Sequence, residues 1–122
     1  MRYLILVRAT AASEAGTPPS AALLAAMGAY HQELATAGVL LDANGLRPSR
    51  EGWRIAHGAD GHRRVIDGPF AETKELIAGY TLIQVRSADE ARAWADRFPA
   101  PFAHTDCEIE VRRLYEPEDF PS

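Results

Sequence analysis

Two strand–helix–strand patterns, one in each half of the chain, constrain the fold more than any other feature of this sequence. In chain order, the expected segments are a strand at 3–7, a helix at 20–37, strands at 39–46 and 80–85, a helix at 87–98 and a strand at 108–112. Short apolar or alternating runs mark the strands, whereas apolar residues at helical spacing mark the helices. Two such halves predict an α+β fold, a ferredoxin-like antiparallel sheet with both helices on one face.

Residues that favour helix ends mark the boundaries of both helices. Ser20 can cap the first helix and Gly38 can end it. Ser87 and Glu90 have the spacing of a capping box at the start of the second helix, and Pro99 stops that helix. Local chemistry therefore predicts these boundaries independently of the periodicity.

A hairpin is expected between the two halves. Residues 53–57 alternate as a strand does, the glycines of 58–61 supply the positive φ angles of a tight turn, and 63–66 form the returning strand. The stretch 9–19 is small, polar and proline-containing, which predicts a loop. The acidic, proline-rich tail 116–122 is expected to be poorly ordered or to lie on the surface.

The first strand is apolar on both faces. Tyr3, Ile5 and Val7 alternate with Leu4 and Leu6, so the strand is expected at the centre of the sheet. Because both helices cover the same face, the other face would expose an apolar patch in an isolated chain. We therefore expect a homodimer in which the sheet of one copy packs on the sheet of the other.

Composition limits the class of protein. The 122 residues, 47% of them hydrophobic, fit a single domain over 1–122. The net charge is −4 and basic residues are scattered, so we expect no nucleic-acid partner. Cys107 is the only cysteine, which rules out an internal disulfide and favours a reducing compartment. The opening apolar run is too short for a signal peptide or a membrane span, so a cytoplasmic location without membrane contact is expected.

Motifs for bound cofactors are missing from the sequence. It contains no GxGxxG, P-loop, GxSxG, HExxH or CxxC pattern. The run 104–107 holds His104, Asp106 and Cys107, but zinc sites usually gather their ligands from separated segments. We therefore predict neither an organic cofactor nor a metal.

One run stands out as a family signature. The segment Asp67-Gly68-Pro69-Phe70-Ala71-Glu72-Thr73-Lys74-Glu75, followed by Gly79-Tyr80, resembles the signature of DGPF-type proteins of the YCII-related family. The order of the remaining segments agrees, so the resemblance covers nearly the whole chain. It implies a dimeric α/β barrel with a pocket at the boundary between sheet and helices, and an activity that is poorly defined.

The resemblance also implies an acid–base pair. In the wider family, a histidine in the first helix and an aspartate just before a proline, after the second helix, are thought to act together. His31 matches the histidine, but Phe98 stands before Pro99 where the aspartate would be. Asp67 is our candidate for the missing carboxylate. From its position beside the apolar stripe, His31 could equally be a hydrogen-bonded core residue or a titrating base.

The signature run has two interpretations. As a turn, Asp67 caps it, Gly68 relaxes the backbone and Pro69 fixes φ. As a site, it supplies an acid and an aromatic wall, with Lys74 pairing an anionic group of a ligand. The substrate-binding residues predicted on this second interpretation are Phe70, Glu72, Thr73, Lys74 and Tyr80.

Two functions remain open at the level of sequence. The chain could be an enzyme without an organic cofactor, in which His31 and Asp67 transfer protons to a small organic molecule in a pocket walled by Phe70 and Tyr80. Alternatively it could be a non-catalytic accessory domain, since DGPF-type proteins tend to accompany sigma-factor-type transcription regulators. The sequence specifies neither the ligand nor the reaction.

Overall fold

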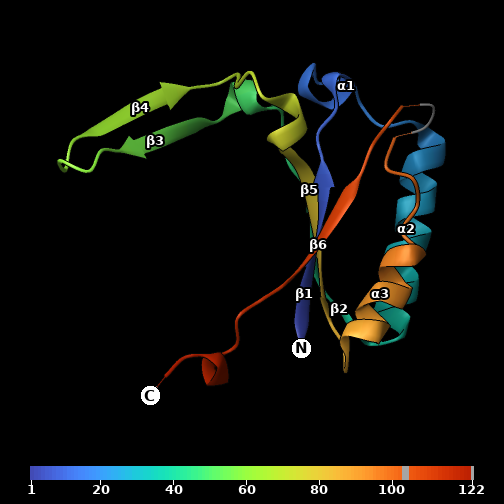
Figure 1. The fold of residues 1–122 in the computed structure, drawn as a ribbon. Coiled ribbons are helices and arrows are strands. Elements are labelled where there is room, and N and C mark those ends of the chain that lie inside the picture. The colour runs from blue at the N-terminus through green and yellow to red at the C-terminus, as the bar shows by residue number, and fades with distance from the viewer. Residues whose placement is uncertain (103–104, 122) are drawn as a thin grey trace.

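A four-stranded antiparallel sheet forms the centre of the computed structural model, which describes residues 1–102 and 105–121. The strands follow the order β2-β5-β1-β6. They are β1 (Arg2–Arg8), β2 (Leu40–Gly45), β5 (Ile77–Gln84) and β6 (Ile109–Arg113). The helices α2 (Ala21–Thr36) and α3 (Ala88–Asp96) cover one face of this sheet (Figure 1). The predicted ferredoxin-like α+β fold is confirmed, with β1 as an inner strand between β5 and β6.

Both long helices begin at the predicted caps. The Ser20 hydroxyl accepts a hydrogen bond from the Leu23 N–H at 3.1 Å, and the Ser87 hydroxyl accepts one from the Glu90 N–H at 3.1 Å. After α2 the chain turns at Gly38, whose φ of 76° suits a residue without a Cβ. No helix within 1–102 or 105–121 combines the length and the apolar character needed to cross a bilayer.

The hydrophobic core lies between the helices and the sheet. Ile5, Leu34 and Ile83 are fully buried there. The Tyr30 hydroxyl donates to the Trp94 carbonyl oxygen at 2.7 Å, which joins α2 to α3. Burial raises the pKa of Tyr30 to about 12, because the phenolate would lose its hydration.

Two stretches expected to lack regular structure are partly ordered. The loop 9–19 contains a one-turn helix, α1 (Ala11–Glu14), whose start is capped reciprocally by Thr10 and Ser13. The sequence predicts a loop here because prolines and small residues outnumber the two residues of this short capping pattern. In the tail, Pro117–Asp119 form a 3₁₀ turn, and Arg2 binds Glu116 through Nε and Oε1 at 2.9 Å.

The predicted hairpin forms but does not join the main sheet. Its strands, β3 (Trp53–His57) and β4 (Arg63–Asp67), pair only with each other, with Ile55 opposite Val65. Figure 1 shows this hairpin, called the arm below, projecting from the side of the sheet that the helices leave open. The C-terminal tail leaves the opposite end of the sheet toward the same side.

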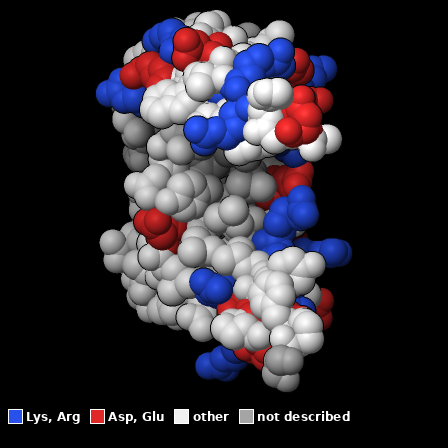
Figure 2. All heavy atoms as spheres, turned by 90° about the vertical axis from the view of Figure 1, so that its left-hand side faces the viewer, with Lys and Arg blue, Asp and Glu red and all other residues white. Residues whose placement is uncertain are grey.

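The open face of the sheet is therefore flanked by two projecting segments. Leu4, Leu6 and Leu82 point to this face and are only half buried. Figure 2 looks onto this side, where acidic and basic side chains gather at the upper end and again toward the lower end. The face without helices thus carries the apolar side chains Leu4 and Leu6 of β1, opposite the charged pair Arg112 and Glu110 of β6.

Candidate functional site

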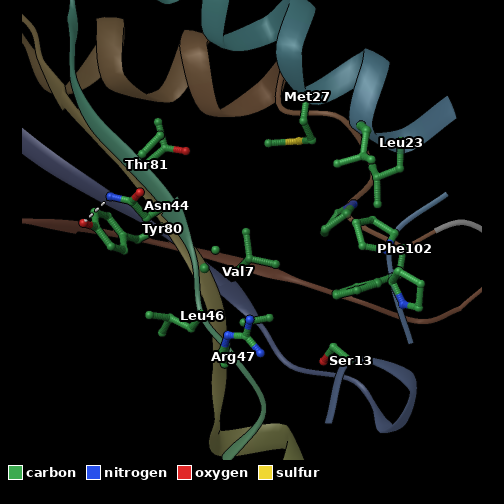
Figure 3. Close-up of a pocket in the computed structure, with 18 of the residues that line it drawn as sticks. Val7, Ser13, Leu23, Met27, Asn44, Leu46, Arg47, Tyr80, Thr81 and Phe102 are labelled. Carbon is green, nitrogen blue, oxygen red and sulfur yellow. Dashed lines mark hydrogen bonds between the residues drawn. The ribbon is translucent and has the colours of Figure 1, made fainter. Parts of the chain in front are cut away.

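A cavity of about 790 Å³ lies between α2 and one end of the sheet. Figure 3 shows Met27 and Leu23 reaching down from α2, with Phe102 at the side and Val7 and Thr81 on the sheet. The cavity lies at the boundary between helices and sheet, where the family resemblance places a pocket. Most of its wall is apolar, so a largely apolar ligand would fit it.

Two glycines that face each other on neighbouring strands create this space, because neither has a side chain to fill it. Gly45 of β2 lies directly opposite Gly79 of β5, and the next pair on the same face, two residues away, is Ala43 with Thr81. Since Thr81 points toward α2, strand alternation places all four positions on the helix-covered face. A Cβ on Gly45 would meet no atom closer than 4.0 Å, whereas one on Gly79 would lie 3.0 Å from the Asn44 carbonyl oxygen. The glycine pair therefore forms a hollow floor beneath α2.

His31 is the titratable group of α2 that lines the cavity. Its Nε2 lies 2.9 Å from Oγ1 of Thr81, a hydroxyl that is almost completely buried. Burial lowers the pKa of His31, because the imidazolium form loses hydration. The ring is consequently neutral at neutral pH and able to accept a proton.

Thr81 is the functional neighbour that the sequence prediction missed. Its signal is visible in the strand pattern, since Thr81 and Ile83 are inward positions of β5, Val85 directly after the strand is also buried, and only the threonine is polar. Phe98 lies where the family pattern has a carboxylate. It is half buried, packs edge-on against Tyr30 with ring centroids 5.1 Å apart, and lines the cavity. An aromatic wall thus stands where an acid was expected.

Asp67 lies outside the cavity that His31 borders. It is exposed at the end of β4, opposite Trp53, and is not among the residues that line the cavity. The physical reason is that the arm leaves the sheet and carries Asp67 with it. A single chain therefore does not bring His31 and Asp67 together, and their pairing stays a prediction.

The turn interpretation of the signature run accounts for its glycine. A Cβ on Gly68 would lie 1.8 Å from the Ser49 carbonyl oxygen, so only glycine fits this close approach. The Gly68 N–H donates to the Gly52 carbonyl oxygen at 3.0 Å, and the Phe70 N–H donates to the Ser49 hydroxyl at 3.0 Å. Glu14 in turn binds the Ser49 N–H at 3.0 Å. The run anchors the root of the arm to the body of the protein.

The remaining predicted binding residues separate into two groups. Phe70 lines a second hollow of about 330 Å³, and the Arg54 guanidinium lies 3.8 Å from its ring centroid. Glu72 pairs with Arg54 at 3.7 Å, an exposed ion pair. Thr73 and Lys74 lie in a 3₁₀ turn, Thr73–Glu75. None of these four borders the large cavity within the described residues.

Tyr80 is the predicted binding residue that does border the large cavity. Its hydroxyl donates to Oδ2 of Asp42 at 2.7 Å and accepts from the Asn44 amide at 3.0 Å, the bond drawn in Figure 3. Because Tyr80 neighbours Thr81 on β5, its ring points to the open face. Tyr80 therefore lies at the edge of the cavity, away from His31.

Potential metal ligands are scattered over the described residues. No cluster of three or more His, Cys, Asp or Glu side chains suited to a metal occurs there. His104 of the run 104–107 lies outside the described residues. Cys107 is a free, half-buried thiol.

Comparisons with known proteins agree with the resemblance seen in the sequence. A model of the YCII-related domain matches residues 1–115. An uncharacterized protein of Rhizobium meliloti (strain 1021) is 36% identical over 97 residues, which cover 79% of this chain and 77% of that protein. The solved structure of 5-chloro-2-hydroxyhydroquinone dehydrochlorinase (TftG) from Burkholderia phenoliruptrix AC1100, in complex with 2,5-dihydroxybenzoquinone, is 17% identical with a TM-score of 0.49 and covers 98% of both chains.

Proposed function

This chain belongs to the YCII-related family, and on that premise we propose that it binds a small, mainly apolar organic molecule beneath α2 and that His31 accepts a proton from it. The observation that carries the proposal is a neutral imidazole on the wall of an otherwise largely apolar cavity of about 790 Å³. Pockets of this size and character commonly hold organic ligands, with few polar groups to orient them.

The distribution of polar groups indicates the chemistry of the ligand. Apolar and aromatic side chains favour a flat hydrocarbon framework. Arg47 borders the cavity from the chain segment after β2, and its largely exposed guanidinium pairs with Glu51 at 3.2 Å. An oxygen or an anionic group of a ligand at the entrance would compete with that carboxylate for Arg47. An aromatic ring would contact the apolar wall, and oxygen substituents on that ring would reach the polar entrance. A hydroxyl group among them would offer His31 an acidic hydrogen.

Thr81 supports a proton-transfer role for His31. A general base works best when a hydrogen bond orients it, and the Thr81 hydroxyl lies within that distance of Nε2. In the acid–base pair predicted from the sequence, Asp67 would fill this role. Its position outside the cavity of its own chain favours Thr81 as the orienting group, while the His31–Asp67 pair remains a hypothesis.

We further propose that two copies pair through the open face of the sheet. Leu4 lies opposite Leu82 at the centre of that face, and both are half buried in the single chain. Glu110 and Arg112 form a charged edge on β6. An apolar centre with a polar rim is the usual anatomy of an interface between proteins.

Titration with 4-nitrophenol tests the proposed site, because the absorbance of this probe reports its ionisation. The wild-type protein should bind the probe as the neutral phenol and raise its apparent pKa, because the cavity is largely apolar and the neutral imidazole of His31 can accept the hydrogen bond of the phenol. Gly45→Leu should abolish binding, because the new side chain occupies the floor of the cavity. Ala35→Leu, at an exposed position of α2, is the matched control and should bind normally.

A second variant tests the contact between His31 and the probe. His31→Leu should still bind 4-nitrophenol, but more weakly, because the hydroxyl of the phenol loses its hydrogen-bond acceptor. Equal binding by Gly45→Leu would exclude this cavity as the site. An unchanged affinity in His31→Leu would exclude His31 as the group that accepts from the phenol and leave a non-catalytic binding role, as in the accessory-domain alternative.

A further inference from the structure

The arm carries an apolar face that its own chain leaves uncovered. Trp53, Ile55 and Val65 lie on one side of the arm, as the pairing of Ile55 with Val65 and strand alternation require. Their side chains are between 45% and 65% exposed. A two-stranded hairpin is only marginally stable in water by itself. Packing of another surface on this face would therefore stabilise the arm.

The charge at the tip of the arm lies on the same side. Arg63 pairs with His57, two positions along β4 from Val65, and therefore shares the face of the apolar residues. Arg64 points to the opposite face, as does Arg54, which is held at the root of the arm by Glu72 and Phe70. The uncovered face thus has an apolar centre, with Arg63 at the tip of the arm and the carboxylate of Asp67, opposite Trp53, at its root.

The C-terminal tail presents complementary chemistry. The rings of Tyr115 and Phe120 contact each other at a tilt of 40°, with centroids 5.1 Å apart, and the two residues are 74% and 57% exposed. Glu118 and Asp119 lie between them in the sequence and are exposed. The tail therefore offers an aromatic pair beside two carboxylates.

Symmetry brings these two surfaces together. The arm and the tail project from opposite ends of the sheet toward its open side (Figure 1). If open faces pair about a twofold axis that runs along the strands, the two arms meet and their Arg63 side chains repel each other. If the axis runs across the strands, each arm meets the partner's tail, and opposite charges face each other.

We propose that the arm of one copy lies on the C-terminal tail of a second copy, with its apolar face on the aromatic pair and Arg63 beside the tail carboxylates. This inference rests on the homodimer proposed above and adds its orientation. The exchange would be reciprocal, since a twofold axis repeats every contact, and it would cover two exposed apolar surfaces of each chain.

Disulfide trapping tests the orientation directly. Val65→Cys and Phe120→Cys are prepared as separate full-length proteins, each with Cys107→Ser, and are mixed and oxidised with diamide. Only the mixture should yield a covalent dimer on non-reducing gels. A covalent dimer from the Val65→Cys protein alone would show that arms meet arms, and would overturn the proposal.

A charge reversal tests the same contact in the native dimer. In sedimentation velocity, Arg63→Glu should weaken dimerisation about tenfold or more, because like charges then face each other. Combining it with Glu118→Lys and Asp119→Lys should restore the affinity. Arg64→Glu, on the other face of the arm, is the matched control and should dimerise as the wild type does.

The outcomes distinguish failure of the dimer from failure of its orientation. A wild-type protein that stays monomeric at every concentration would refute both the homodimer and the arm exchange. A wild-type dimer that is indifferent to Arg63→Glu would refute the arm exchange and leave the homodimer standing.

Discussion

Among single residues, His31 makes stability depend on pH in a defined direction. Burial holds its pKa below the ordinary 6.5, so the unfolded chain binds a proton more readily than the folded chain. The stabilising contribution is therefore complete above pH 6.5 and is lost as the pH falls through the folded-state pKa. Urea unfolding at pH 8 and pH 5 should show a smaller loss at pH 5 for His31→Gln than for the wild type. Parallel losses would contradict this assignment.

Thr81 should control the orientation of the His31 ring. Thr81→Val keeps the shape of the side chain but removes the hydroxyl that lies 2.9 Å from Nε2. We expect a loss of about 1 kcal/mol in the free energy of unfolding, and a changed tautomer ratio of His31 in ¹⁵N NMR spectra. Thr81→Ser should retain the wild-type ratio. If the valine variant also keeps that ratio, Thr81 does not orient the ring.

Gly68 should tolerate no side chain at all. The methyl group of Gly68→Ala would collide with the Ser49 carbonyl oxygen, which belongs to the rigid backbone of a turn. The free energy of unfolding should fall by at least about 2 kcal/mol. Gly28→Ala provides the comparison, since no atom lies within 4 Å of its new Cβ and alanine favours the helix. Chemical denaturation of both variants measures the contrast, and equal stabilities would contradict it.

At the scale of elements, a hydrogen bond from a buried tyrosine helps to join the two long helices. Tyr30 of α2 donates to the Trp94 carbonyl oxygen of α3 at 2.7 Å. Tyr30→Phe leaves that carbonyl unpaired while keeping the ring against Phe98, so it should cost about 1 kcal/mol in the free energy of unfolding. Thermal denaturation followed by circular dichroism measures the loss. An unchanged melting temperature would show that water replaces the phenol.

The elements themselves were largely predictable because their signals are local. Ser20 and Ser87 cap α2 and α3 as expected, and the hairpin forms with its turn at 58–61. The one-turn helix α1 was missed because its Thr10–Ser13 capping pattern stands in a loop rich in prolines and small residues.

At the scale of the whole molecule, dimerisation should link stability to concentration. If two copies fold together through the open face, mass action raises the melting temperature as protein concentration increases. Differential scanning calorimetry over a hundredfold concentration range measures this dependence. The Arg63→Glu protein should show the same trend displaced to higher concentrations. A melting temperature independent of concentration in the wild type would argue against the homodimer.

The candidate site was only partly predictable. His31 was identified from its place beside the apolar stripe and from the family resemblance, and it does line the cavity. Asp67 is the predicted partner because the signature run stands next to a strand that faces the helix of His31, but proximity in the sequence does not tell whether the strand that ends at Asp67 joins the sheet. The arm separates from the sheet, and Thr81 occupies the position beside the imidazole.

By itself, the sequence determined which segments are strands and helices, where the helices begin, and which strand is apolar on both faces. Those properties follow from side-chain spacing and capping within a few residues. Only the tertiary structure decided that Gly45 and Gly79 meet to hollow out a cavity, that Thr81 reaches His31, and that the arm stands clear of the sheet. These features depend on register and on contacts between distant segments, which local patterns do not encode.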